Sequence, residues 1–220
     1  MVLQYIEALD ALARRNEISA TLKQRIESLR SADTTLAAIA EGLAASDDVT
    51  FGLADNAAKA RGMETFAQHA NRFREGKGWL GYHLFRLLQD ANDVRLEEVL
   101  EMATERIDLA QVARGPAREL GLGPGTESYH LLTSVLQELA RFPGRGARFL
   151  LAGLGSPVIP NRNMALRTLA AWGRERWSPE IREALESAAR IEPDEDVQAR
   201  FERVLAGAPY DEEVRTPSPD

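Results

Sequence analysis

Cysteine is absent from the 220 residues of the chain. The protein therefore has no means of forming disulfides, zinc–thiolate sites, iron–sulfur clusters or a thiol nucleophile. The absence fits a protein of the reducing cytosol, and we expect a cytoplasmic location. A hydrophobic fraction of 44% and a charged fraction of 28% are typical of a soluble globular protein.

Long apolar runs are also lacking. The longest stretch without a charge runs over residues 149–161, and glycine and proline interrupt it. A membrane-spanning helix needs roughly 18 or more apolar residues, so we expect no membrane association. Glu7 and Asp10 stand where a signal peptide would carry its basic and apolar regions, which argues against secretion.

Lysine is scarce, because only Lys23, Lys59 and Lys77 occur and the other 24 of the 27 basic residues are arginine. This skew, together with abundant alanine, is typical of a protein encoded by a GC-rich bacterial genome. The net charge of −7 argues against a general nucleic-acid binder, whose affinity comes largely from phosphate neutralisation.

The positive charge is concentrated in one segment. Residues 141–176 carry seven arginines and one acid, Glu175, which is a local balance of +6. Two interpretations remain open. These arginines either face solvent and pair with neighbouring helices, or they form a basic patch for an acidic partner.

A helical pattern fills nearly the whole chain. Val2, Ile6, Leu9 and Leu12 form the first apolar stripe at 3.6-residue spacing, and later segments repeat this spacing without sustained alternation. Residues 48–74 are rich in alanine and poor in start and stop signals, although we expect them to be helical. The sequence predicts an all-α protein.

Helix starts recur at a regular interval in the second half of the chain. Predicted starts at Arg145 and Pro179 are 34 residues apart, and those at Asn161 and Asp194 are 33 apart. Short turns between such helices favour antiparallel hairpins. We predict about ten helices in a single domain over residues 1–207, most clearly repetitive over 78–207. An acidic, disordered tail is expected over 208–220.

The sequence "PNRNMALRTLAAW" resembles the first-helix segment of HEAT-like repeats, and "PDEDVQARFERVLAG" resembles the next such segment. The resemblance covers residues 78–206 and implies hairpins stacked as a short α-solenoid, a fold that most often serves as an interaction scaffold. HEAT-like folds also include DNA glycosylases. Trp172 and Trp177 within the arginine-rich segment keep a glycosylase-like enzyme among the alternatives.

A second resemblance runs from "WLGYHLFRLL" through "SPVIPNRNMALRTL" to "IEPDEDVQARFERVL". Together these segments look like bacterial proteins of which some carry a limonene hydroxylase label. That resemblance implies oxygen activation, which needs haem, flavin, copper or non-haem iron. The chain offers no glycine-rich dinucleotide loop between a strand and a helix, and we expect no cofactor.

Imidazole chemistry is limited to His69, His83 and His130. Glu127 and His130 have the i, i+3 spacing of di-iron bundles, but such sites need two of these motifs, so we expect no metal site. We interpret His83 as a histidine at the edge of the core, stacked on Trp79. No catalytic residue is predicted.

The stretch "SPVIPNRNMALRTLAAWG", residues 156–173, has a distinctive helix entrance. Its two prolines should hold the linker extended, and Asn161 should act as the N-cap. Arg162 should lie in the seam between hairpins and bond carbonyls or an acid, such as one of residues 194–196. Asn163 and Arg167 should point outward and, with Arg145 or Arg148, present donors to a bound segment.

We therefore predict a non-enzymatic scaffold that binds a protein or peptide, with an acidic partner as one candidate, through an arginine-rich face. The alternative is an enzyme on the same scaffold, either hydroxylase-like or glycosylase-like. The identity of the partner and the oligomeric state do not follow from the sequence.

Overall fold

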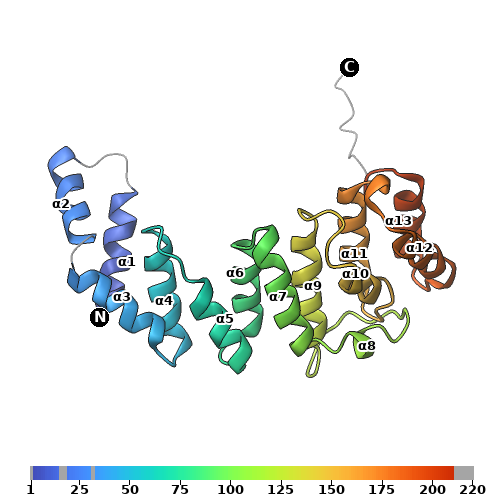
Figure 1. Ribbon diagram of the computed structural model, residues 1–220, viewed down its shortest axis with the longest axis horizontal. Helices are drawn as coiled ribbons and strands as arrows, with labels where there is room; N and C mark the ends of the chain where they lie inside the picture. The colour runs from blue at the N-terminus through green and yellow to red at the C-terminus, as the bar shows by residue number, and fades with distance from the viewer. Residues whose placement is uncertain (1, 15–18, 31–32, 211–220) are drawn as a thin grey trace, which may run out of the picture. The chain divides into compact units, whose positions relative to one another are not determined.

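A computed structural model describes residues 2–14, 19–30 and 33–210 (Figure 1). Within these ranges the regular secondary structure is helical, and the only extended pairing is an isolated bridge between Glu119 and Val158. The predicted all-α class is confirmed. Most of the predicted tail, from residue 211 onward, lies outside the described residues.

Contacts divide the chain into two compact units, residues 1–86 and 87–220, with the boundary inside α6. The helices that begin in the first unit are α1 (Val2–Ala13), α2 (Ala20–Arg30), α3 (Asp33–Ala44), α4 (Asp48–Lys59), α5 (Phe66–Glu75) and α6 (Leu80–Gln89). Those of the second unit are α7 (Asp93–Arg106), α8 (Leu109–Val112), α9 (Glu127–Leu139), α10 (Ala147–Leu154), α11 (Ile159–Trp172), the 3₁₀ turn η1 (Arg174–Arg176), α12 (Pro179–Ile191) and α13 (Glu195–Ala206).

The first unit is built around α1, α3 and α4, which pack on one another. Ile6 of α1, Ile39 of α3 and Phe51 of α4 are almost completely buried in one cluster. Gly42 allows this close packing, because a Cβ there would lie 2.7 Å from the Cβ of Ala54. Residues 48–74, which have few helix start and stop signals, form α4 and most of α5. Their small alanine side chains allow close packing despite the weak apolar pattern.

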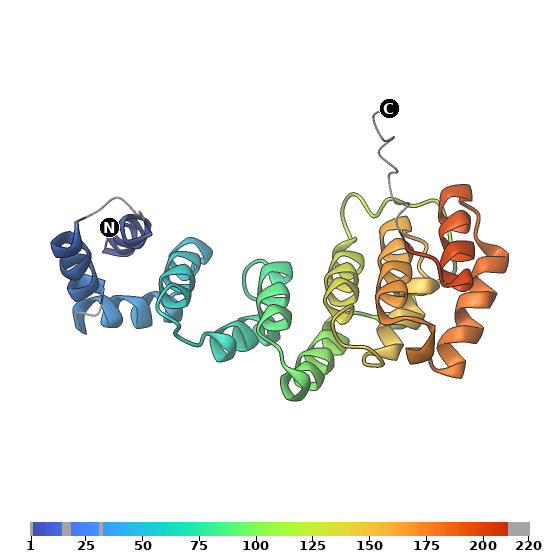
Figure 2. The ribbon, with the colours of Figure 1, turned by 90° about the horizontal axis from the view of Figure 1, so that it is seen from above.

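The second unit places its helices in two rows. The helix α11 contacts both α9 and α13, while α10 contacts α8, α9, α11 and α12 (Figures 1 and 2). Side chains of α11 bond carbonyls of α9: Asn161 Nδ2 to Tyr129 O at 3.0 Å, Thr168 Oγ1 to Leu136 O at 2.6 Å and Trp172 Nε1 to Leu139 O at 2.7 Å. These bonds fix the register between the two helices.

The residue types of Ser178 and Asp108 predict helix N-caps, and Gly207 is predicted to close the last helix; the structure confirms all three. Ser178 caps α12 by accepting the Ile181 amide at 3.2 Å, Asp108 caps α8 by accepting the Gln111 amide at 3.0 Å, and Gly207 ends α13 at φ +78°. Capping works here because each short polar side chain satisfies an amide that the first turn leaves without a partner.

The predicted N-cap at Asn161 is wrong. Helix α11 begins at Ile159, its N-cap is Val158, and that cap makes no side-chain bond. Pro160 lies inside the first turn, where its missing N–H removes no intrahelical bond. Pro160 is therefore part of the helix and not of an extended linker.

Candidate partner-binding site

Arg162 lies in the seam of the second unit. Its Nε and Nη2 bond Oε2 and Oε1 of Glu192 at 2.7 and 2.8 Å, and Nη1 bonds Ser156 O at 2.8 Å. Neither the Arg162 nor the Glu192 side chain is exposed to solvent. The acid is Glu192, at the end of α12, and not one of residues 194–196, because Pro193 ends α12 and the connection turns Glu192 inward.

Arg145 and Arg148 face α7. Arg145 Nη2 lies 2.6 Å from Glu97 Oε1, and Arg148 Nη2 lies 3.0 Å from Glu101 Oε1. The two acids are four residues apart on α7 and therefore share one side of that helix. The four side chains remain about half exposed, at 40–66%. Exposed ion pairs of this kind contribute about 0–1 kcal/mol each, so a partner can compete for them.

Asn163 and Arg167 lie one turn apart on α11, on the side next to α13. Asn163 Oδ1 accepts a hydrogen bond from Arg200 Nη1 at 3.2 Å. Arg167 is exposed, and among the described residues it has no carboxylate partner. Arg203 follows Arg200 by three residues on α13, at a spacing that places both on one side. We call Asn163, Arg167, Arg200 and Arg203 the basic face.

The predicted binding residues therefore turn toward different neighbours. Arg145 and Arg148 reach back to α7, whereas Asn163 reaches forward to α13. The sequence did not identify Arg200 or Arg203 as members of the face. Their i, i+3 spacing in the last predicted helix was the available signal. Asp196 lies one turn before Arg200, on the same side of α13.

The first unit contains a buried polar network that the sequence analysis missed. Its centre is Asp55 of α4, which is fully buried. Asp55 accepts hydrogen bonds from Thr65 Oγ1 at 2.7 Å, Tyr82 Oη at 2.6 Å and Arg86 Nε at 3.1 Å. His69 Nε2 lies 3.0 Å from Asp55 Oδ1, although it is not aligned as a hydrogen bond. These contacts join α4 to α5 and α6.

Two buried histidines extend this network. His69 Nδ1 lies 2.9 Å from His83 Nδ1, and Arg72 Nε donates to His83 Nε2 at 3.3 Å. Since Arg72 is always a donor, a neutral His83 carries its proton on Nδ1 and donates it to His69 Nδ1. His69 then carries its proton on Nε2, facing Asp55. Arg72 also bonds Ala45 O at 2.7 Å and pairs with Asp48, which ties the network to the start of α4.

The charges of the network follow from burial and contacts. Burial opposes ionisation of Asp55, but contacts with His69, Tyr82 and Thr65 outweigh it and hold the pKa of the carboxyl well below its ordinary value. Burial, then the neighbouring His69 and Arg72, lower the pKa of His83 to about 4. Burial and the bond to Asp55 raise the pKa of the Tyr82 hydroxyl. At neutral pH the carboxyl of Asp55 is therefore ionised and paired with Arg86, and the His83 imidazole is neutral.

The predicted stacking of His83 on Trp79 is wrong. Trp79 is 73% exposed and stacks on Tyr82, with ring centroids 6.4 Å apart. His83 is 2% exposed and meets the Phe51 ring edge-on at 5.4 Å. A signal was present, because His83 occupies an apolar-stripe position between Leu80 and Leu87. In such a position a polar residue has to find a buried partner.

Metal-ligand geometry is not found in the described part of the chain, where no three histidine, aspartate or glutamate side chains cluster. His130, the partner in the Glu127 motif, instead places Nε2 at 2.9 Å from Gly121 O. The glycine-rich stretch around Gly121 belongs to an irregular connection, in which Ile159 N donates to Glu119 O at 2.9 Å.

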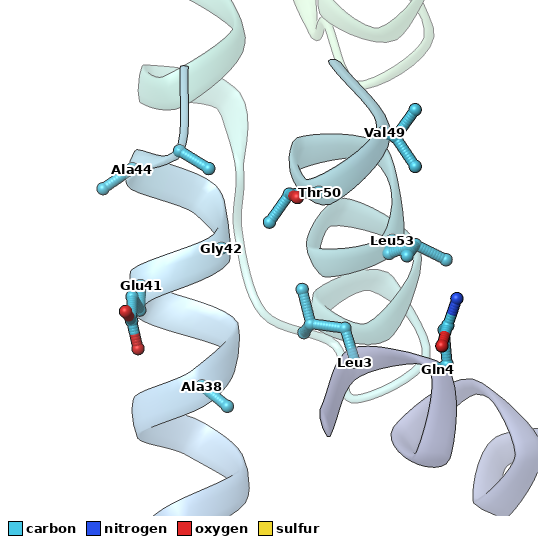
Figure 3. A pocket seen from close by; sticks show the side chains of 10 residues that line it. Leu3, Gln4, Ala38, Glu41, Gly42, Ala44, Val49, Thr50 and Leu53 are labelled. Carbon is cyan, nitrogen blue, oxygen red and sulfur yellow. The ribbon is translucent and has the colours of Figure 1, made fainter. Parts of the chain in front are cut away.

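An open groove lies in the first unit between α3, α4 and the start of α1 (Figure 3). It has a volume of about 670 Å³. Leu3 projects from α1 into the space between α3 and α4, with Ala38 and Gly42 on one side and Thr50 on the other. Most of the lining is apolar.

No helix among the described residues is long and apolar enough to cross a membrane. Comparison of the chain with family models, with curated proteins and with solved structures gives no significant match.

Proposed function

We propose that this protein is a non-enzymatic interaction scaffold that binds an acidic segment of a protein or peptide through the basic face of its second unit. The observation that carries the proposal is the state of Arg167. It is an exposed arginine with no carboxylate partner among the described residues, next to the Arg200–Asn163 bond between α11 and α13. Its donors are available to carboxylates of a partner.

The architecture that we propose for this scaffold is a short HEAT-like solenoid in which α10–α11 and α12–α13 are successive hairpins. Support comes from the packing of α9, α11 and α13 in sequence along one row. The bonds from Asn161, Thr168 and Trp172 to α9 carbonyls span 32, 32 and 33 residues. This interval is close to the periods of helical-hairpin arrays.

Arg145 and Arg148 are proposed as a secondary contact. They are already paired with Glu97 and Glu101. A partner that displaces one of these acids therefore gains only the difference in free energy between the new exposed ion pair and the old one. Arg167 requires no such exchange. The order of importance expected for binding is therefore Arg167 before Arg145 and Arg148.

Binding of a fluorescein-labelled peptide rich in glutamate, followed by anisotropy, tests the proposal. We expect the wild-type affinity to fall as NaCl is added, because exposed charges are screened. Arg167→Glu should weaken binding by about tenfold, since 1.4 kcal/mol corresponds to that factor. Arg190→Glu is the matched control, because Arg190 is exposed on α12 and the change in net charge is the same.

Three outcomes would count against this proposal. Equal weakening by Arg167→Glu and Arg190→Glu would mean that only overall charge matters. Stoichiometric iron or a visible absorbance band in the purified protein would favour the hydroxylase-like alternative, and release of an altered base from DNA would favour the glycosylase-like one.

A further inference from the structure

We propose that the groove between α1, α3 and α4 is a second docking site, whose occupant is an amphipathic helix of a partner with an apolar face flanked by lysine or arginine. This site lies in the first unit and is independent of the basic face. It goes beyond the proposed function because it takes a partner of opposite charge.

The lining of the groove explains the apolar half of this occupant. Leu3, Ala38, Val49 and Leu53 contribute apolar surface, and Val49 is 74% exposed. A partner side chain that covers this valine and the apolar hollow beside it removes their surface from water. Such burial contributes about 25 cal/mol of free energy per Å² of apolar area. The ends of leucine, isoleucine or phenylalanine side chains fit such a hollow.

The extent of the groove explains why a helix fits better than a single small molecule. Leu53 also lines an adjoining hollow that continues along α4 to Asn56 and Ala60. The two hollows together follow α4 for more than two turns, from Val49 to Ala60. Helix-in-groove recognition uses anchors spaced at i, i+3, i+4 and i+7 over this length.

The charges at the apolar end of the groove are of one sign. Glu41 is the one charged residue of the ten that line it, and its carboxylate projects from α3 (Figure 3). Asp47 caps α4 two residues before Val49, with Oδ1 accepting the Thr50 amide at 2.8 Å. No lysine or arginine lines this end among the described residues, and the adjoining hollow is lined by two acids, Glu7 and Asp10, and two bases, Arg14 and Lys59, whose charges balance. Complementary charge on the occupant is therefore positive.

Two synthetic helices with the same leucine face test the inference, one with lysine and the other with glutamate on its polar face. We expect the lysine helix to bind wild-type protein at least about tenfold more tightly than the glutamate helix. Val49→Asp should abolish this binding by placing a charge in the groove. Non-specific attraction of a cationic peptide would instead increase, because the variant is more acidic.

Val94→Asp is the matched control. Val94 is 84% exposed and is the second residue of α7 after Asp93, as Val49 is the second residue of α4 after Asp48. We expect Val94→Asp to bind like the wild type, and Glu41→Lys to bind more weakly than the control Glu183→Lys on α12. Circular dichroism checks that all four variants remain folded.

Equal binding by the Val49→Asp and Val94→Asp variants would overturn the inference. So would equal affinity for the two helices, which would show that charge plays no part. Self-association of the wild type that Val49→Asp abolishes, without binding of either helix, would also overturn it, because the occupant would then be a second copy of the chain. These outcomes do not depend on whether the glutamate-rich peptide binds the basic face, so the two proposals can fail separately.

Discussion

The guanidinium of Arg162 and the carboxylate of Glu192 form a two-point ion pair at 2.7 and 2.8 Å from which solvent is excluded on both sides. The pair connects the first turn of α11 to the end of α12, and Ser156 O completes the donors of Arg162. A buried pair with this geometry contributes mainly by preventing an unpaired charge in the interior. Removal of one partner is therefore expected to destabilise the fold much more than replacement of both partners by apolar residues would.

Arg162→Ala should lower the free energy of unfolding by about 3–5 kcal/mol, because Glu192 is left buried without a partner. Urea unfolding followed by tryptophan fluorescence measures this change, since Trp172 and Trp177 are buried in the same unit. Arg148→Ala, which breaks an exposed pair, should cost no more than about 1 kcal/mol. A loss below that value for Arg162→Ala would contradict the seam assignment.

Substitutions at Asn161 distinguish a bond between helices from a cap. Asn161→Ala should cost about 1–3 kcal/mol through loss of the bond to Tyr129 O. Asn161→Asp should cost more, because a buried carboxylate would face that carbonyl oxygen. An N-cap would give the opposite order, since aspartate caps as well as asparagine does. Thermal unfolding of the two variants gives the order directly.

The stability of the first unit should depend on pH through His83. In the unfolded chain this histidine takes up a proton near its ordinary pKa of 6.5, whereas in the fold its pKa is lowered to about 4. The contribution of His83 to the free energy of unfolding is therefore fully present above pH 6.5. About 3 kcal/mol of it is lost as the pH falls from 6.5 to about 4. Asp55 contributes below this window, because its lowered pKa makes its share disappear only under more acidic conditions.

His83→Gln should remove most of this slope, since glutamine does not titrate. Urea unfolding followed by the backbone amide signals of α4 and α5, at several pH values between 4 and 7, measures the difference from the wild type. An unchanged slope in the variant would show that His83 is not the group that titrates.

Local signals in the sequence predicted much of the fold. Ser178 before Pro179 and Asp108 before α8 were sufficient to place helix starts, because a cap depends on residues within one turn. Pro160 misled the prediction at α11, since a proline fits both an extended linker and a first helical turn. A single sequence does not separate the two.

Contacts between distant residues were not predictable in the same way. Arg145 finds Glu97 across 48 residues, and His69 finds His83 across 14. Helical periodicity indicates which side of a helix is buried but not which helix covers it. The sequence therefore did not show that Glu97 and Glu101 lie opposite Arg145 and Arg148.

The most direct test of the proposed scaffold is a titration of the protein with the glutamate-rich peptide, observed through the Nε–Hε signals of its arginines by nuclear magnetic resonance. The largest shifts are expected at Arg167 and Arg200, with smaller ones at Arg145 and Arg148 and none at the buried Arg162. Added NaCl should reverse them together. Shifts spread evenly over all exposed arginines, or confined to residues away from α11 and α13, would contradict the account.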